Sequence, residues 1–336
     1  MTVEARLTTD TDRAYHALQH GAVVADRSDR LRMRFTGEKA AESLTGLVTN
    51  DVASLSAGQG QYAAALTPKG KVLADLRIFA RTGEFLVDAN PAAGPGFFAM
   101  IRKFVNPRLA KYEDVTQQTF SLGLFGPGAQ DMLRSAFPDA NLAGLSLYAH
   151  ISASLGDESV MIARVPDFGV EGYDIIGPRS LMESLRSKLV AAGAVESGAD
   201  VLAIARIEAG RPEWGADMDD SMLAQEVDMD RLDAISFTKG CYTGQETVAR
   251  VHYRGHVNRL LRGLRFSEGV VPSSGTELHD SDGKSVATVK SGAVSPRLGA
   301  IALALVRREI EPGAVLRAAV EGRAVEGTVE SLPFSV

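Results

Sequence analysis

The chain has 336 residues and a mass of 35.7 kDa, more than one compact core usually holds, so we expect two or three domains. A formal net charge of −6 argues against broad nucleic-acid binding, because such binding needs an excess of Lys and Arg. The single cysteine excludes an intrachain disulfide and a multi-thiolate metal site. No signal peptide is visible between Met1 and Gly21, and the longest apolar run, Ile301 to Val306, is too short for a membrane span. We therefore expect a cytoplasmic protein.

The first hundred residues predict strands, a short helix and a hairpin. Residues 30–35 alternate basic and apolar side chains, which is the period of a half-buried strand. A helix is expected over residues 39–47, with Thr36 as its N-terminal cap. Two further strands, at residues 61–66 and 72–80, predict a hairpin joined by a turn that contains Pro and Gly.

A weak similarity between two parts of the chain indicates that a similar order of strands and helices occurs twice. Residues 84–105 have the pattern of a strand, a Pro/Gly-rich break and a helix, and residues 160–189 that of a strand pair followed by a helix. The glycine-rich segment Gly123–Gly128 has no Lys-Ser/Thr and fits a strand-to-helix turn better than a phosphate-binding loop. We predict an α+β region of two intertwined subdomains with antiparallel sheets, the second half covering approximately residues 120–197.

The pattern of the chain changes after Val257. Short alternating runs recur, separated by turns such as Asp282-Gly283, and no helix signal of useful length is present. These runs predict a small C-terminal β-barrel of five or six short strands. We place the α+β region at residues 1–256 and the barrel at residues 257–336.

The only cysteine lies in the string Lys239-Gly240-Cys241-Tyr242-Thr243-Gly244-Gln245-Glu246. The flanking glycines let the backbone turn tightly and expose the thiol, and the Lys239 cation favours a thiolate. This setting predicts a reactive sulfur. A buried structural cysteine is the alternative.

Two histidines, His252 and His256, follow the cysteine. Either could assist Cys241 in covalent catalysis if a hydrogen bond joined them. A metal site would need both histidines on one helix, which Gly255 disfavours, so we expect no metal site. The basic residues between Lys239 and Arg265 indicate either a local basic pocket or a solvated basic face.

The segment Arg206–Gly215 supplies a second candidate site. It closes a helix predicted over residues 198–210, and Glu208 lies just before the glycine that ends this helix. Such a carboxylate can face a pocket and accept hydrogen bonds from the amino-pyrimidinone edge of a pterin. A surface or capping glutamate is the alternative, and the segment by itself favours it.

Taken in order, several segments resemble the YgfZ family of folate-binding proteins, within the wider superfamily of the glycine-cleavage T protein, an aminomethyltransferase. The resemblance runs from about residue 30 to residue 306, and the Lys-Gly-Cys-Tyr-x-Gly-Gln-Glu string is its most specific part. The matching segments are Leu47–Val52, Arg206–Pro212, Leu223–Val227, Ile235–Glu246, Val248–Arg250 and Tyr253–Gly255.

The resemblance implies an aminomethyltransferase-like ring of domains around a central folate pocket, closed by the C-terminal barrel. It implies an accessory factor in the assembly or repair of iron–sulfur proteins, acting indirectly on tRNA modification, with iron–sulfur client or assembly proteins as partners. Tetrahydrofolate or a derivative is the implied cofactor. The implied site residues are Cys241 and Lys239 for thiol chemistry, Glu208, Asn50, Tyr62 and Arg250 for folate, and Gly240, Tyr242, Gly244, Gln245 and Glu246 within the motif.

Two departures from the superfamily pattern bear on activity. T proteins carry adjacent acids after a glycine-rich turn, the first being regarded as catalytic, whereas this chain has Ala74-Asp75. Because alanine cannot relay a proton, we do not expect standard aminomethyl transfer, and a tetrahydrofolate-dependent one-carbon transferase is our alternative. Some YgfZ proteins contact folate through tryptophans, but the only Trp is Trp214, and Arg30 and Leu202 occupy the matching places.

Direct tRNA binding, a third hypothesis, is disfavoured by the acidic net charge.

Overall fold

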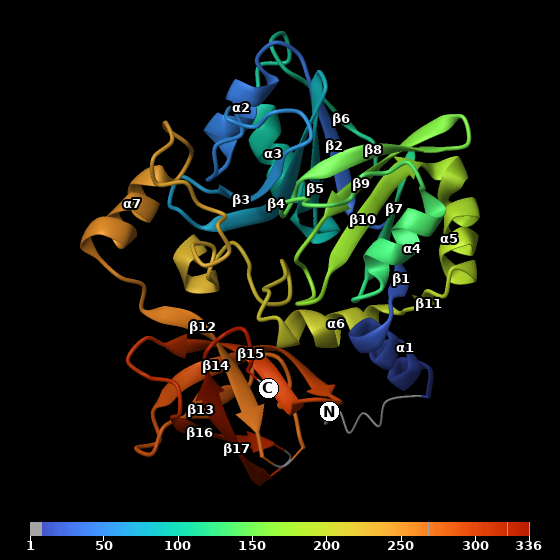
Figure 1. Cartoon of the computed structure of the whole chain (residues 1–336). Coiled ribbons are helices and arrows are strands. Elements are labelled where there is room, and N and C mark those ends of the chain that lie inside the picture. Colours follow the sequence, from blue (N-terminus) through green and yellow to red (C-terminus); the bar gives the residue numbers. More distant parts are fainter. Residues whose placement is uncertain (1–8, 268, 321, 336) are drawn as a thin grey trace.

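Two sheets, antiparallel except for one short edge strand, lie above a closed barrel in the computed structural model, which describes residues 9–267, 269–320 and 322–335 (Figure 1). The predicted α+β fold with antiparallel sheets and a small C-terminal barrel is confirmed. No helix among the described residues is long and apolar enough to cross a membrane. The first eight residues, part of the segment predicted to lack a signal peptide, lie outside the described residues.

One sheet is built from the early part of the chain and has the order β3-β4-β5-β2-β6. Its buried face packs under two helices, with Ala74, Leu76 and Ile78 of the long strand β4 in that core. The elements are β2 (Leu31–Thr36), α2 (Ala40–Leu47), β3 (Gly60–Leu66), β4 (Val72–Arg81), β5 (Glu84–Ala89), η1 (Pro91–Ala93), α3 (Gly94–Phe104) and β6 (Lys111–Asp114).

The other sheet has the order β11-β1-β7-β10-β9-β8 and joins distant parts of the chain. Strand β1, near the N-terminus, pairs with β7 and with β11, so this sheet joins the start of the chain to its middle. The elements are α1 (Thr9–His20), β1 (Val23–Asp26), β7 (Thr119–Phe125), α4 (Ala129–Ala136), β8 (His150–Leu155), β9 (Glu158–Arg164), β10 (Gly172–Pro178), η2 (Arg179–Leu181), α5 (Met182–Ala191) and β11 (Val195–Glu196).

The barrel closes in the order β12-β15-β14-β13-β16-β17. Alternate side chains such as Leu264, Val289 and Ala302 fill its interior, as the period-2 pattern predicts. Helix α6 lies between the sheets and the barrel (Figure 1). The elements are α6 (Ala199–Glu208), η3 (Ala224–Val227), α7 (Gln245–Arg254), β12 (Arg259–Phe266), β13 (Glu277–His279), β14 (Ser285–Ser295), β15 (Gly299–Arg307), β16 (Val315–Val320) and β17 (Arg323–Glu330).

One local prediction is wrong and another is confirmed. Thr36 does not cap α2, because it is still the last residue of β2 and pairs there with Lys111. Gly255 prevents one helix from carrying both histidines, as expected, because it takes an extended conformation and ends α7. His252 therefore lies on α7, whereas His256 lies beyond its end.

The cysteine motif forms a loop that packs on the Thr67–Gly70 turn and continues into α7. Gly244 has a φ of +85°, and a Cβ at this position would lie 2.6 Å from the Thr67 carbonyl oxygen. Glycine is therefore required at this position by both conformation and space. Gly240 faces open space, with nothing within 4 Å of a Cβ placed there.

The substitution Gly244→Ala should lower the free energy of unfolding by about 1–3 kcal/mol, because alanine meets a strained φ and a backbone clash. The matched control Gly240→Ala should change it by no more than about 0.5 kcal/mol. Urea unfolding of the full chain measures both. Equal effects at the two glycines would contradict this account of the loop.

Candidate functional site

The main cavity has a volume of about 340 Å³ and is lined by segments that are far apart in the sequence. Strands β3 and β4 contribute Tyr62 and Asp75, and the loop before β10 contributes Asp167 and Phe168. Helix α6 and the segment after it complete the wall. The cavity therefore exists only once both sheets and α6 have assembled.

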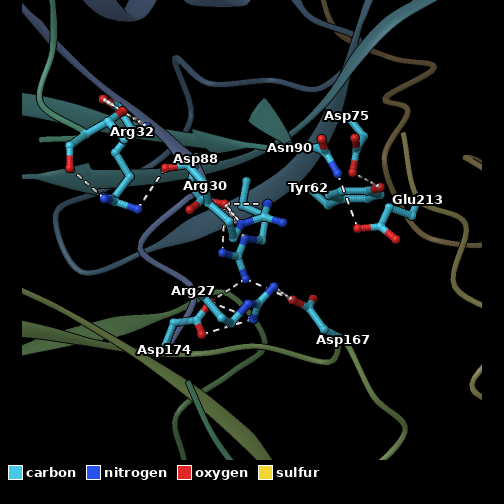
Figure 2. Close-up of polar contacts among 12 residues, drawn as sticks. Arg27, Arg30, Arg32, Tyr62, Asp75, Asp88, Asn90, Asp167, Asp174 and Glu213 are labelled. Carbon is cyan, nitrogen blue, oxygen red and sulfur yellow. Dashed lines mark hydrogen bonds and ion pairs between the residues drawn. The ribbon is translucent and has the colours of Figure 1, made fainter. Parts of the chain in front are cut away.

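Asp75 presents a carboxylate to this cavity. Tyr62 donates its hydroxyl hydrogen to Oδ2 of Asp75 at 2.9 Å, whereas the buried Oδ1 has no hydrogen-bond partner (Figure 2). Burial raises the pKa of Asp75, and the nearby Arg30 cation opposes this shift only in part. Burial also raises the pKa of Tyr62 well above its ordinary value, so Tyr62 stays a hydrogen donor.

Our inference from Ala74 is wrong for a geometric reason. Successive side chains of a strand point to opposite faces, and in β4 Ala74 points into the apolar core and is fully buried there. Asp75 points to the cavity. An acid at position 74 would lie in the core, so its absence removes no acid from the site.

A network of buried ions lies beside the cavity and ties the two sheets together (Figure 2). Arg77 on β4 contacts Asp88 at 2.7 Å, Asp167 at 2.9 Å and Asp174 at 2.5 Å. Arg27 reaches Asp167 at 2.8 Å and Asp174 at 3.0 Å from the other side. Both Asp88 and Asp174 are fully buried, so only their arginine partners make their charges tolerable.

The arginines determine the charge state of these aspartates. Burial by itself would raise the pKa of Asp88, but Arg30, 2.6 Å away, and Arg77 outweigh it and the net shift is downward. The pKa of Asp167 is likewise lowered, because Arg77, Arg27 and Arg211 outweigh its burial. Asp88 and Asp167 are therefore ionised, whereas the pKa of Asp75 is shifted in the opposite direction.

Glu208, the predicted pterin anchor, does not line the main cavity. It is buried toward the barrel, where it accepts hydrogen bonds from Tyr15 at 2.6 Å and from Ser295, and pairs with Arg297 at 3.3 Å. Helix α6 explains this placement, because Glu208 and the cavity-lining Arg206 lie on different faces. Glu208 therefore connects α1, α6 and the barrel.

Cys241 is exposed, which removes the buried-cysteine alternative, but it is not among the residues that line the main cavity. Lys239 does not serve the thiol as predicted. Its ammonium donates to the carbonyl oxygens of Thr45, Val48 and Asn50, at the end of α2. Burial lowers the pKa of Lys239 to about 8. Lys239 thus anchors the loop.

The remaining predicted residues divide between cavity and loop. Tyr62 lines the cavity, whereas Asn50 and Arg250 do not. The Asn50 amide donates to the Tyr62 and Asp233 carbonyl oxygens. Arg250 is exposed on α7. The ring of His252 stacks on Phe237 at 3.7 Å. The other motif residues, Gly240, Tyr242, Gly244, Gln245 and Glu246, belong to the loop and the start of α7.

Sequence reasoning missed the polar residues that shape the cavity, namely Arg77, Asp167, Arg211 and Glu213. A signal existed for Arg77, because a charged residue inside the apolar run of β4 is expected only where a partner is buried with it. No local signal existed for Asp167, since its partners are 90 and 140 residues away in the chain.

Comparison with models of known protein families shows to which family the chain belongs. Residues 4–239 match the GCVT N-terminal domain, and residues 259–335 match the glycine cleavage T-protein C-terminal barrel domain. The chain belongs to the glycine cleavage T-protein family. A crystal structure of the glycine cleavage system aminomethyltransferase T from Bartonella henselae has the same fold, with a TM-score of 0.87 at 22% identity over 97% of this chain and 89% of that one.

Two curated relatives show the activity by which similar proteins are named. An aminomethyltransferase from a Nostoc species is 27% identical over 96% of this chain and 87% of that protein. An aminomethyltransferase from Saccharopolyspora erythraea is 28% identical over 95% and 88%. These relatives contradict the predicted role as an iron–sulfur accessory factor and favour the transferase alternative. The wider superfamily is confirmed, and the YgfZ branch is not specifically supported.

Removing Arg77, the central cation of the buried network, should strongly destabilise the folded protein. We expect Arg77→Met to lower the free energy of unfolding by about 3–5 kcal/mol, because Asp88 and Asp174 lose a partner inside the protein. Arg34→Met is the control, since the pair of Arg34 with Glu113 is exposed on both sides and is worth about 1 kcal/mol or less. Guanidinium unfolding of both variants tests this, and a similar small loss in both would refute it.

Proposed function

We propose that the chain is a tetrahydrofolate-dependent aminomethyltransferase, which moves a one-carbon unit from an amine donor to tetrahydrofolate, with Asp75 as its acid–base group. The observation that carries this proposal is that Asp75 lines the main cavity and that its buried Oδ1 has no hydrogen-bond partner. Buried carboxylate oxygens are normally hydrogen-bonded, so an unpartnered one on a cavity-lining residue is suited to a ligand donor. The names of the family relatives point to the same chemistry.

The cavity residues fit the pterin end of a folate. A flat bicyclic ring needs apolar walls, and Tyr62, Phe168 and Leu202 offer aromatic and aliphatic surface. Its amino-pyrimidinone edge needs acceptors, and Glu213 is a cavity-lining carboxylate whose contacts with Asn90 and Arg206, at 3.2 and 3.3 Å, leave acceptor capacity. Glu213 takes the role that we had assigned to Glu208.

Tetrahydrofolate, when bound, supplies the nucleophilic nitrogen that accepts the one-carbon unit. Asp75 accepts the proton that the attacking nitrogen loses, and a proton delivered to the donor's amino nitrogen lets that nitrogen leave as its bond to the one-carbon unit breaks. Its pKa is raised by burial, which makes the carboxylate a better proton acceptor than an exposed aspartate. Tyr62 keeps Oδ2 occupied, so proton exchange is directed to Oδ1. The five cavity-lining arginines remain cationic and orient polar groups without exchanging protons.

The substitution Asp75→Asn should lower the rate of tetrahydrofolate-dependent one-carbon transfer by about 10²–10⁴-fold, since the amide cannot accept the proton. Cys241→Ser should leave the rate unchanged, because Cys241 lies outside the cavity. The assay follows methylene-tetrahydrofolate formed from an aminomethyl donor. A cysteine variant that loses activity while Asp75→Asn retains it would reverse the assignment.

The pH dependence of the transfer rate follows from the protonation of Asp75. Transfer requires the Asp75 carboxylate, so the rate falls as the pH drops through the pKa of Asp75, and this fall begins at a higher pH than for an ordinary aspartate because burial raises that pKa. A rate profile from pH 4 to pH 8 measures the acid limb.

Binding is tested separately, since a reduced folate in excess should raise the melting temperature. No thermal shift with reduced folates would defeat the proposal.

A further inference from the structure

The side chain of Arg211 is shared by two cavities. It lines the main cavity and also a second cavity, of about 340 Å³, that contains Glu208 and Phe334. Phe168 is shared in the same way. The Arg211 side chain is only 15% exposed, and the proposed proton transfer does not use it directly. Its contacts therefore need another explanation.

Arg211 contacts two stacked tyrosines, Tyr62 and Tyr148. Its guanidinium donates a hydrogen bond to the Tyr148 hydroxyl at 2.7 Å and lies 5.4 Å from the centre of the Tyr62 ring. The rings of Tyr62 and Tyr148 are stacked, with centroids 6.1 Å apart and planes 7° from parallel. Asp167, 3.9 Å from Arg211, holds the guanidinium from the far side. These contacts fix the Tyr62 ring by stacking and by a cation–π interaction.

Tyr148 is held in a strained conformation. Its φ is +62°, a left-handed value that is uncommon for a residue with a bulky side chain. Its amide donates to the Arg164 carbonyl oxygen, and its own carbonyl oxygen would lie 2.4 Å from a Cβ on Gly60. Strain of this kind persists only where the surrounding structure enforces it, and it concentrates at functional sites.

We infer that Arg211 and Tyr148 form a clamp that holds the Tyr62 hydroxyl on Oδ2 of Asp75, so that Oδ1 stays without a partner and is left for the reactant. Tyr62, Tyr148 and Arg211 come from β3, the segment before β8 and the segment after α6. Arg211 and Tyr148 are positioning residues, because they reach Asp75 only through Tyr62. The inference deepens the proposed function and rests on it for the role of Oδ1.

The clamp predicts a shared effect on Asp75. The Tyr62 hydrogen bond stabilises the ionised carboxylate, so losing it raises the pKa of Asp75 further. Tyr62→Phe removes this bond directly and should lower kcat/KM near neutral pH by about tenfold or more. Arg211→Met and Tyr148→Phe should move the acid limb of the rate profile in the same direction, to higher pH, by less than Tyr62→Phe does.

A double-variant cycle separates the clamp from a direct effect of the Arg211 charge. If Arg211 acts through Tyr62, adding Arg211→Met to Tyr62→Phe produces no further shift of the acid limb. If the charge acts on Asp75 through space, the two shifts add, and the inference is wrong. It is also wrong if Arg211→Met lowers activity or stability while the acid limb stays in place, since that is the behaviour of a merely structural residue.

The same cycle can be run without any turnover. Carbon-13 NMR of the Asp75 carboxyl group, assigned by comparison with Asp75→Asn, measures its titration in the free protein for the wild type, Tyr62→Phe, Arg211→Met and the double variant. A non-additive upward shift in a protein with no transferase activity would uphold the clamp and reject the proposed function. Additive or absent shifts in an active enzyme would reject the clamp and leave the transferase standing.

Discussion

Charge neutralisation inside the protein is the constraint on which the rest of the structure depends. Asp88 and Asp174 have no access to water, so their negative charges are tolerable only where Arg27, Arg30 and Arg77 meet them. These arginines and aspartates come from both sheets, so the sheets can assemble in only one relative position. That position creates the cavity, and with it the place where a ligand can meet Asp75.

Within this frame, carboxylates with the same chemistry have different roles. Asp167 is surrounded by arginines and stays ionised, which suits a structural charge. Asp75 has a tyrosine hydroxyl on one oxygen and nothing on the other, and burial makes it more basic. The number of nearby cations therefore separates the acids that support the site from the one that can exchange a proton there.

The cysteine motif holds parts of the fold together, a role that its composition does not suggest. Lys239 satisfies three carbonyl oxygens at the end of α2, and Gly244 allows the loop to approach the Thr67 carbonyl oxygen. These contacts fasten the loop and α7 to the first sheet. The exposed thiol of Cys241 lies outside the cavity and has no part in the transfer chemistry that we propose.

The sequence by itself determined the features whose signals are local, namely the alternating strand β2, the hairpin of β3 and β4, the helix that Gly210 follows and the all-β pattern after Val257. It also indicated the wider superfamily. Tertiary structure decided which residues make the site. The side of β4 that faces a cavity depends on where the second sheet packs, so the sequence could not show that Asp75, and not position 74, carries the useful acid. Glu208 looked like a ligand group because the barrel residues Ser295 and Arg297, which engage it, lie nearly ninety residues away. Buried charges choose partners by proximity in space, and that proximity exists only after the chain has folded.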